Sequence, residues 1–378
     1  MKDLVQCREE IDEIDRKITA LFEERMEVAA EVAEYKRAIG KKVFDKEREE
    51  QKLAVIEGMA SNVYFARGLR ELFTQIMSLS RKYQYTMLAE EGQSGFSVTE
   101  ALSCGKGEAA AYFGEPGSYT EQALLQSLGE ACERISCKSF PAVVEAVENG
   151  TAKYGVVPIE NTTTGDISDL YDLLAVHPVY PVAEQVIKIE HMLVAPAGAT
   201  EEGIKEVYSH PQALLQCSSY FEQHPGLMQR ACSSTSGCAM EVAETGDRTK
   251  AAIASEQAAK HYGLTILRRG LNNENINSTR FLVLSKEAVF TKTADKVSIC
   301  FEIMHEAGSL YRILSHLIYN NLNMTKIESR PIPGKQFEYR FFIDFDGKLS
   351  EPAVQNALTG IREEVSRLKV LGCYKAFV

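Results

Sequence analysis

The chain has 378 residues, 45% hydrophobic and 25% charged, a composition typical of globular proteins with two or three domains. A formal net charge of −11 argues against a nucleic-acid partner, although a local basic pocket for a small anion is compatible with it. The N-terminus is charged and no apolar stretch approaches the length of a membrane span, so we expect neither signal peptide nor membrane. Nine scattered cysteines without a CxxC pair predict reduced thiols in the cytoplasm, rather than a disulfide framework or zinc site.

An alternating three-four spacing of apolar residues predicts one long helix over the first 40 residues. Arg25 stands where this spacing demands an apolar residue, and a charge buried in a helix seam is costly unless something pairs with it. A neighbouring glutamate such as Glu24 or Glu27 can supply the partner, and so can a bound carboxylate. We favour the carboxylate, because more polar residues face the same way further along.

Two further helices are predicted after a Gly-Lys-Lys loop. DKERE at 45–49 opens the second helix, and the third continues an apolar face with Ser80 and Gln84, one helical turn apart. This three-helix segment, residues 1–88, resembles the all-helical chorismate mutase family over essentially its whole length. The resemblance rests on residues that fall where the family keeps its active site: Arg8, Arg25, Lys36, Asp45, Arg48, Glu49, Ser80 and Gln84.

The resemblance implies a concerted rearrangement of chorismate to prephenate, which requires no nucleophile or cofactor. Such an enzyme must hold the folded substrate and stabilise charge that grows on the breaking ether oxygen. By the resemblance, Arg8, Arg25 and Arg48 bind carboxylates. Lys36 and Gln84 donate to the ether oxygen, and Glu49 holds the ring hydroxyl.

The spacing along the first helix predicts an oligomer. Arg8 and Arg25 are seventeen positions apart, which is about 25 Å along one helix, too far for both side chains to reach one small molecule. Arg25 and Lys36 are about 16 Å apart and can meet a shared ligand by reaching inward. We therefore expect Arg8 to serve a site on another subunit, and the protein to be a homodimer or higher homo-oligomer.

Residues 89–107 contain Gly and Ser without helical periodicity and predict a linker. From Ala109, short apolar strands alternate with helices, which is typical of an α/β domain, here over residues 108–285. A Pro-Gly turn at 116–117 precedes Ser118 and Glu121, which predict a capping box at a helix start that favours an anion. By itself the turn is equally well explained as a structural feature.

Polar side chains follow several predicted strands of this domain, where ligands collect in open α/β folds. The segments are VPIENTTTG at 157–165, SHPQ at 209–212, SST at 233–235 and STRF at 278–281. Three of these segments, VPIENTTTG, SHPQ and STRF, together with EPGSYTEQA at 115–123, resemble the prephenate dehydratase family. The resemblance implies two α/β lobes of the periplasmic-binding-protein type, with the active site in the cleft between them.

The implied reaction is loss of hydroxide and carbon dioxide from prephenate, giving phenylpyruvate. Thr279 matches the threonine regarded as essential in the family, and we assign it hydrogen-bond donation to the leaving hydroxyl, because its hydroxyl is too weak an acid for certain proton transfer. Glu160 is a candidate proton source if a closed cleft keeps it protonated. Arg280 is either a carboxylate clamp or part of a surface ion pair. The candidate substrate-binding set is Glu160, Asn161, Thr162, His210, Gln212 and Arg280, with His210 by itself better explained as a structural histidine.

Residues 296–378 predict βαββαβ, a ferredoxin-like unit, with a helix from about 351 to 368 and a last strand at 370–374. GSL at 308–310 and ESRP at 328–331 resemble ACT-type regulatory domains, with Ser309 in place of a usual Ala and Met324 in place of a usual Leu. The resemblance implies an allosteric phenylalanine site, formed by Gly308, Ser309, Leu310, Glu328, Ser329 and Arg330.

The sequence thus predicts a multidomain, feedback-inhibited enzyme of phenylalanine biosynthesis. Its parts are an all-α three-helix mutase unit (1–88), a linker (89–107), a two-lobed dehydratase (108–285) and a ferredoxin-like ACT domain (296–378). Expected ligands are chorismate, prephenate and phenylalanine, without cofactor or metal. Three alternatives stay open: one catalytic unit has decayed, arogenate is the dehydratase substrate, or the chain is an amino-acid sensor without catalysis. The polar sets around Arg25 and Thr279 argue against the sensor, which needs neither.

Overall fold

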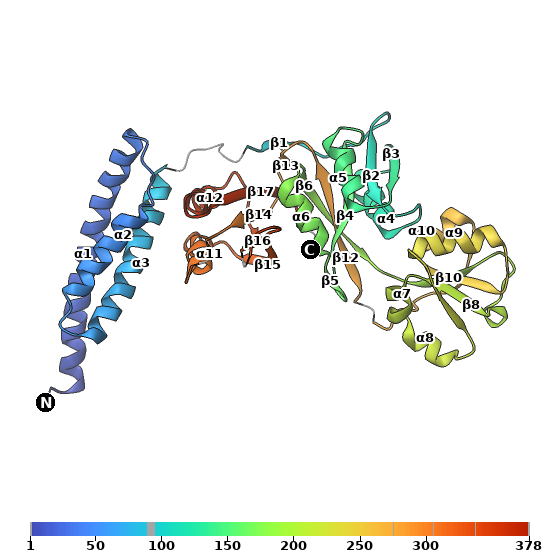
Figure 1. The fold of residues 1–378 in the computed structure, drawn as a ribbon, viewed down its shortest axis with the longest axis horizontal. Helices are drawn as coiled ribbons and strands as arrows, with labels where there is room; N and C mark the ends of the chain where they lie inside the picture. Colours follow the sequence, from blue (N-terminus) through green and yellow to red (C-terminus); the bar gives the residue numbers. More distant parts are fainter. Residues whose placement is uncertain (1, 89–94, 275, 305, 337, 377–378) are drawn as a thin grey trace. The chain divides into compact units, whose positions relative to one another are not determined.

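The structure is a computed structural model that describes residues 2–88, 95–274, 276–304, 306–336 and 338–376 (Figure 1). The chain divides into two compact units, one formed by Met1–Ser94 and Cys300–Lys369, the other by Gly95–Ile299 and Val370–Val378. Two strands, β14 (Lys296–Glu302) and β17 (Arg367–Tyr374), continue from one unit into the other. No helix in the described ranges is long and apolar enough to cross a membrane.

Three helices form the N-terminal part of the first unit, as predicted: α1 (Leu4–Ala38), α2 (Lys46–Gly58) and α3 (Val63–Leu88) (Figure 1). A capping box starts α1, in which Asp3 accepts from the N–H of Gln6 and the Gln6 side chain accepts from the N–H of Asp3. Asp45 caps α2 by accepting from the N–H of Arg48.

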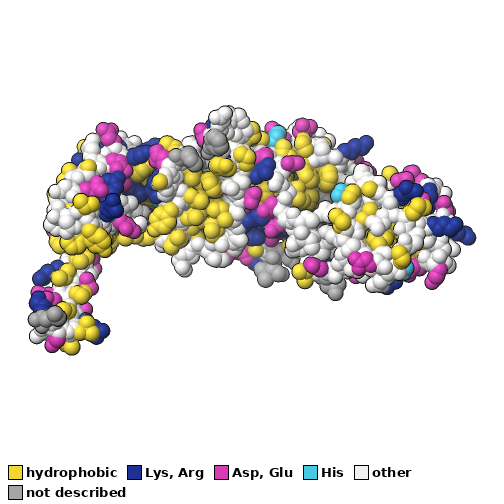
Figure 2. All heavy atoms as spheres, turned by 60° about the horizontal axis from the view of Figure 1, so that its bottom comes forward, with side chains coloured by type: hydrophobic (Ala, Val, Ile, Leu, Met, Phe, Trp, Pro, Cys, Tyr) yellow, Lys and Arg dark blue, Asp and Glu magenta, His cyan; other side chains and the backbone are white. Residues whose placement is uncertain are grey.

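Helix α1 is longer than α2 and α3, and only its C-terminal half contains buried residues. It has 35 residues, against 13 in α2 and 26 in α3, and its buried residues, Ala29 and Ala33, lie in its C-terminal half. Leu4, Ile11 and Ile18, in its N-terminal half, are each more than half exposed. Apolar side chains therefore lie open at the surface of these helices, at the left of Figure 2.

The C-terminal part of the first unit follows the predicted order βαββαβ. Its elements are β14, α11 (Ser309–Tyr319), β15 (Met324–Pro331), β16 (Tyr339–Asp346), α12 (Pro352–Glu364) and β17, with sheet order β15-β16-β14-β17. The predicted last helix is four residues too long. Val365 is extended, so α12 ends at Glu364, and the last strand starts at Arg367 rather than 370.

The second unit contains two sheets. The first has the order β3 (Glu133–Cys137), β2 (Ala109–Phe113), β4 (Tyr154–Asn161), β12 (Ser278–Ser285), β6 (Tyr180–Lys188), with β5 (Gly165–Asp166) on β4. The second has the order β11 (Thr265–Arg268), β7 (Met192–Ala195), β10 (Lys250–Ala254), β8 (Glu206–Ser209), β9 (Met228–Ala231). The chain leaves the first sheet after β6 and returns to it with β12, so it crosses twice between two lobes.

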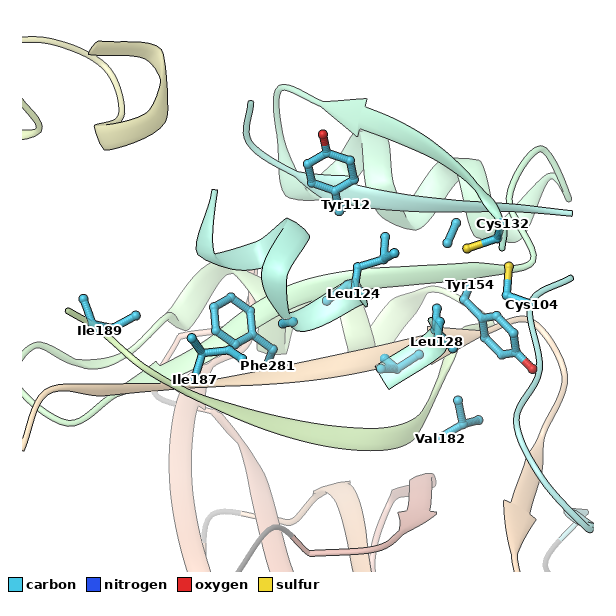
Figure 3. Packing of buried hydrophobic residues seen from close by; sticks show 14 residues of the cluster. Cys104, Tyr112, Leu124, Leu128, Cys132, Tyr154, Val182, Ile187, Ile189 and Phe281 are labelled. Carbon is cyan, nitrogen blue, oxygen red and sulfur yellow. The ribbon is translucent and has the colours of Figure 1, made fainter. Parts of the chain in front are cut away.

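Helices cover both sheets. Those of the first lobe are α4 (Tyr119–Leu128), α5 (Phe140–Glu148) and α6 (Ser168–Val176). Those of the second are α7 (Pro211–Gln216), α8 (Ser218–Gln223), α9 (Thr235–Thr245), α10 (Glu256–Tyr262) and a 3-10 turn at Glu201–Gly203. In the first lobe Leu124 of α4 lies in one core cluster with Tyr112, Ile187 and Phe281 from three strands (Figure 3). This packing holds β12 at Phe281, next to the predicted site residues Thr279 and Arg280.

The Pro-Gly turn before α4 is a structural joint between the lobes. The carbonyl of Pro116 accepts from the hydroxyls of Ser236 and Tyr262, and that of Gly117 accepts from Ser255. Gly117 has a φ of 81°, and an added Cβ would lie 2.6 Å from the Cα of Ala258, so the position requires glycine.

The predicted capping box at this helix forms only by half. The hydroxyl of Ser118 accepts from the N–H of Glu121, as expected. The carboxylate of Glu121 accepts from the N–H of Gly117, at 2.6 Å, rather than from that of Ser118. The carboxylate of Glu121 thus accepts from the residue before the helix cap. The start of α4 therefore already has an anion of the protein beside it.

One sequence prediction needs correction, and one pair of cysteines lies closer together than the sequence indicates. The predicted linker contains strand β1 (Ser97–Thr99), which pairs in parallel with β13 (Val289–Thr291), while residues 89–94 lie outside the described part. Cys232 and Cys238 lie close together, with Cα atoms 6.2 Å apart, a separation that a disulfide can span. The first turn of α9 brings these two residues together, a proximity that a search for CxxC pairs does not detect.

Candidate active sites

The N-terminal helices enclose a cavity of about 290 Å³ that is lined by predicted site residues. Seven of them line it: Arg25, Lys36, Asp45, Arg48, Glu49, Ser80 and Gln84. Arg8 is not among the lining residues, in agreement with its distance from Arg25 along α1. Apolar residues of α1 and α3, such as Val28 and Met77, complete the wall.

Arg25 presents a cation to this cavity without a protein partner. Its Nη1 is buried and has no hydrogen-bond partner among the described residues. Burial lowers the pKa of Arg25 below its usual value, and the charge of Glu49 only partly opposes this. No ion pair of Arg25 with Glu24 or Glu27 is formed in the described part of the chain, so neither glutamate compensates its partial burial.

Lys36 and Gln84 lie at the same cavity. Nζ of Lys36 donates to the carbonyl of Val43 at 2.5 Å, and burial lowers the pKa of this lysine, with the charge of Asp45 opposing the shift. Oε1 of Gln84 is buried and lacks a partner among the described residues, while its Nε2 lies 3.5 Å from the hydroxyl of Ser80. Nζ of Lys36 and Nε2 of Gln84 can each donate to an oxygen atom of a bound molecule.

Asp45 has a structural role that the sequence also indicates. Besides capping α2, its carboxylate pairs with Lys41 at 3.0 Å, which lowers its pKa together with the N–H of Arg48. This arrangement fixes the start of α2, and thereby Arg48 and Glu49 on its first turn.

Two charged residues of this cavity escaped the sequence analysis. Lys52 lines it one turn after Arg48. Arg81 lines it next to Ser80 and donates from Nη1 to both oxygens of Glu49, at 2.5 and 2.6 Å. Lys52 follows Arg48 and Glu49 at helical spacing and could have been found. Arg81 gives no such signal, because its partners are distant in sequence.

In the two-lobed unit, Asn161 at the end of β4 organises a polar network. Its Nδ2 donates to Oδ1 of Asn277 and to Oγ1 of Thr279, both at 2.8 Å. Its Oδ1 accepts from the N–H and the hydroxyl of Thr163. β12 runs antiparallel to β4 with Thr279 opposite Asn161, which is why two residues 118 positions apart meet.

The network leaves two donors available. Thr279 is 8% exposed, and its hydroxyl oxygen accepts from Asn161. Its hydroxyl hydrogen can therefore donate to a bound molecule. Nδ2 of Asn277 is buried and has no partner among the described residues. Asn277, which the sequence analysis left out of its candidate set, is thus a second amide donor beside Thr279.

Thr162 and Gln216 link the network to its surroundings. The hydroxyl of Thr162 donates to the carbonyl of Ile276 and accepts from the N–H of Ser278, so it fixes the loop before β12. Gln216 of α7 donates to the hydroxyl of Thr163 at 3.0 Å and contacts Nε2 of His191 at 3.0 Å. Gln216 therefore connects the second lobe with the polar strand end of the first, a role that no motif indicated.

Arg280 is held by protein carboxylates. It pairs with Glu160 and Glu184, each at 3.0 Å, and Glu184 also pairs with Lys296 at 2.9 Å. The side chain of Glu160 is 40% exposed, whereas that of Glu184 is 2% exposed. Arg280 thus takes part in ion pairs with a side chain that is only 13% exposed, not at the surface.

His210 caps α7 by accepting from the N–H of Gln212. This matches the interpretation of His210 as a structural residue. The Gln212 side chain is half-buried at the same helix start.

Comparisons with known proteins agree with both sites. Residues 7–85 match the family model "Chorismate mutase type II", and residues 110–289 match "Prephenate dehydratase". A "Bifunctional chorismate mutase/prephenate dehydratase" of Aquifex aeolicus is 33% identical over 377 residues, covering 99% of this chain and 98% of its own length. The chain belongs to the family of bifunctional chorismate mutase/prephenate dehydratases.

Two further relatives concern the dehydratase side of this bifunctional family. "Arogenate dehydratase/prephenate dehydratase 2, chloroplastic" of Arabidopsis thaliana is 34% identical, covering 81% of this chain and 82% of its own. A solved prephenate dehydratase in complex with L-Phe, from Arthrobacter aurescens, aligns with a TM-score of 0.66 at 29% identity, over 71% of this chain and 90% of its own.

A second pocket, of about 280 Å³, lies in the C-terminal part of the bifunctional chain. It is lined by Ile303, Met304, Glu306, Gly308, Ser309, Leu310, Tyr311, Glu338, Tyr339 and Phe341. The predicted residues of the helix start, Gly308, Ser309 and Leu310, are included. The predicted residues of β15, Glu328, Ser329 and Arg330, are not. They pair with β16, where Ser329 lies opposite Phe341.

Proposed function

We propose that this chain converts chorismate to prephenate in its helical cavity and prephenate to phenylpyruvate between its two lobes, under control by phenylalanine. The observation that carries the proposal is Arg25, a half-buried cation at a cavity of about 290 Å³, whose buried Nη1 has no hydrogen-bond partner among the described residues. A structural helix bundle gains nothing from such a charge, whereas a site for a dicarboxylate requires it.

In the proposed mutase reaction, Arg25 and Arg48 bind the substrate carboxylates. Lys36 and Gln84 donate to the ether oxygen as its bond to the ring breaks, and Glu49 accepts from the ring hydroxyl. Asp45 and Ser80 complete the site. The rate enhancement comes from holding the folded conformer and from donors already oriented at the developing charge, so no proton has to leave the enzyme.

Arg8 belongs, in this proposal, to the cavity of a second subunit. It lies on the half of α1 whose apolar residues, including Ile11 and Ile14, are more than half exposed. A second copy of the helices that covers this stripe would bury it and carry Arg8 to the partner's cavity. We therefore propose a homodimer through α1.

In the proposed dehydratase reaction, Thr279 donates a hydrogen bond to the leaving hydroxyl as the carboxylate departs as carbon dioxide. Asn161 orients Thr279 by donating to its oxygen, and Asn277 offers a further donor to the substrate. Thr162 holds the loop before β12. The remaining candidates, Glu160, His210, Gln212 and Arg280, are proposed as outer contacts of the substrate that engage it if the lobes close.

Residues 296–378 are proposed to be an ACT-type sensor of ferredoxin-like fold, supported by the element order and sheet order. Its pocket combines the start of α11 and Gly308 with two carboxylates, Glu306 and Glu338, and with apolar Leu310 and Phe341. A helix start suits a carboxylate, acidic side chains suit an ammonium group, and the apolar wall suits an aromatic ring. An amino acid such as phenylalanine has all three.

The β15 residues Glu328, Ser329 and Arg330 stand on an edge strand of this sheet. We propose that they reach phenylalanine bound to another subunit, because an edge strand is a natural place for contact between copies. The two-lobed domain's kinship with periplasmic binding proteins, the domain limits 1–88, 108–285 and 296–378, and a cytoplasmic location stay predictions.

Incubating the full-length protein with chorismate and following prephenate and phenylpyruvate tests both activities at once. Transient prephenate followed by phenylpyruvate supports the proposal. Prephenate that persists would mean a decayed dehydratase, and unchanged chorismate a decayed mutase. Comparing kcat/KM for prephenate and for arogenate decides between the two dehydratase substrates.

A further inference from the structure

A row of charged side chains leads from the mutase cavity to helix α12. Arg81 donates from Nη1 to both oxygens of Glu49, and from Nε to Oε1 of Glu364 at 3.1 Å. The same oxygen of Glu364 accepts from Nε2 of His316 at 3.1 Å. The side chain of Arg81 is 6% exposed, and those of Glu364 and His316 are 2% exposed. These three side chains are therefore shielded from water, while the side chain of Glu49 at the cavity is 23% exposed.

This burial makes the geometry of Arg81 well determined. The guanidinium is fixed at two of its nitrogens and lies 4.9 Å from the ring centre of Phe44, so both its position and its plane are set. Burial raises the pKa of Glu364, but the hydrogen bond from His316 and the charge of Arg81 outweigh it, so the pKa lies below its usual value. Glu364 is thus held as the anion that Arg81 needs.

The same part of the chain holds the loop before α2 at further points. Oε2 of Glu363 accepts from the N–H of Phe44 at 3.0 Å and from the hydroxyl of Tyr85 at 3.3 Å. Lys46, the first residue of α2, pairs with Glu306 at 2.7 Å. Glu49 lies on the first turn of α2, so these contacts also restrict the helix that carries it.

We propose that Arg81 is a positioning residue for the mutase reaction, which fixes Glu49 in the orientation that binds the substrate, and that Glu364 of α12 fixes Arg81 in turn. The inference rests on the proposed mutase function of the cavity. It extends the mutase site to the C-terminal part of the chain, 283 residues away in sequence from Arg81.

The alternative is that Arg81 is only a salt bridge that stabilises the fold. The chain offers a matched control for that alternative. Arg70, also on α3, pairs with Glu50 and Glu57 of α2 at 2.7 and 2.9 Å, but it does not line the cavity. Arg70→Met removes the same kind of bridge between the same two helices and should leave mutase turnover unchanged.

A double-mutant cycle in the full-length protein tests the proposal. Arg81→Met should lower mutase kcat by about a hundredfold, the loss expected when a catalytic group is misplaced by about 1 Å. In the background of Glu49→Gln the same change should cost almost nothing, because the group that Arg81 positions no longer acts. Equal losses in both backgrounds would overturn the proposal and make Arg81 a structural bridge.

Two milder variants keep the test valid if Arg81→Met does not fold. Glu364→Gln, nearly isosteric, should lower mutase kcat by about tenfold, since it weakens the hold on Arg81 without removing it. Arg81→Lys should have a mutase kcat below that of the wild type but well above a hundredfold loss, because it keeps the charge and loses only the second nitrogen contact. A wild-type mutase rate in folded Glu364→Gln would overturn the role of α12.

Two controls separate this inference from the proposed function. Far-UV circular dichroism and thermal unfolding of each variant should match the wild type, which verifies that the helical unit is folded, and dehydratase turnover on supplied prephenate should be unchanged. If the wild-type protein itself does not rearrange chorismate, the proposed function fails. If the wild type is active and Arg81→Met is equally fast, only the positioning role fails.

Discussion

The two candidate active sites solve the problem of buried polar groups in opposite ways. The mutase cavity leaves polar atoms such as Nη1 of Arg25 and Oε1 of Gln84 without partners among the described residues. The network at Asn161 instead satisfies most of its own groups, and Thr279 is held by a hydrogen bond at 2.8 Å. The first site therefore depends on its ligand for compensation, while the second is organised before the ligand arrives.

This difference matches the chemistry proposed for each. The rearrangement of chorismate forms no bond to the enzyme. The site must bind a dianion and stabilise the negative charge that develops on its ether oxygen, which requires cations that no protein group neutralises. A dehydration whose product becomes aromatic needs one well-aimed donor, and a network that aims Thr279 is sufficient. Mutations should accordingly have their largest effect where the ligand is the only partner.

The largest effect should come from Arg25→Ala. Removing the unpaired cation should lower mutase kcat/KM by about a thousandfold, at the upper end for a lost charge-stabilising contact. Dehydratase turnover on supplied prephenate should persist, because Arg25 and the Asn161 network belong to different units. Steady-state rates on each substrate check this. Loss of both activities in a folded variant would contradict separate sites.

Thr279→Val sharpens the other side of the comparison. The change is nearly isosteric and should lower dehydratase kcat by about a hundredfold through loss of one donor, with little change in KM. Mutase turnover should stay at the wild-type level. Thr151→Val, in an exposed turn, is the control. A wild-type dehydratase rate in Thr279→Val would move the catalytic role to Asn277 or Glu160.

Phenylalanine control should respond to the start of α11. Gly308 has a φ of 76°, so Gly308→Ala strains the backbone at the proposed amino-acid site. We expect the phenylalanine concentration for half-inhibition of the dehydratase to rise about tenfold, as for a lost interaction of about 1.4 kcal/mol.

Gly334 provides the matched control for this change. It lies in the same domain with a φ of 78°, outside the pocket, so Gly334→Ala imposes a similar strain without touching the site. Inhibition curves that shift equally in both variants would show that strain in the domain, and not the pocket, governs sensitivity. Point changes are preferable to deletion of 296–378, because residues 370–378 belong to the unit of the dehydratase.

The smallest expected change is a partial recovery of mutase activity in dimers that combine Arg8 and Arg25 variants. Subunits carrying Arg8→Ala and subunits carrying Arg25→Ala should each lack mutase activity, and their heterodimers should regain about half of it, because one of the two shared sites is intact. The mutase rate of reassembled, verified heterodimers is the measurement. Absence of any regain would place both arginines in one subunit's site and remove the support for a dimer through α1.

Local pattern was enough to predict much of this molecule. The three-four spacing predicted α1, and the misfit of Arg25 in it pointed to a ligand that the cavity geometry supports. Alternation and turn signals predicted β2, β4 and the βαββαβ order. These features depend on residues close together in sequence, where periodicity decides which face is buried.

The sequence could not predict what depends on distant partners. In the sequence Arg81 cannot be told from a surface arginine, because its partners Glu49 and Glu364 are distant along the chain. The role of Gln216 likewise depends on its contact with Thr163 of the other lobe. β1 was assigned to a linker because its pairing strand, β13, follows almost 200 residues later. The end of α12 was misplaced because Val365 continues its apolar pattern with an extended backbone.

The most direct test of two separate sites is a mixing experiment with full-length variants. Arg25→Ala alone should leave chorismate unchanged, and Thr279→Val alone should convert it to prephenate that accumulates. The two proteins in one tube should form phenylpyruvate from chorismate, because each supplies the site that the other lacks. Phenylpyruvate from chorismate in Arg25→Ala alone, or none in the mixture while each variant keeps its one activity, would contradict the account.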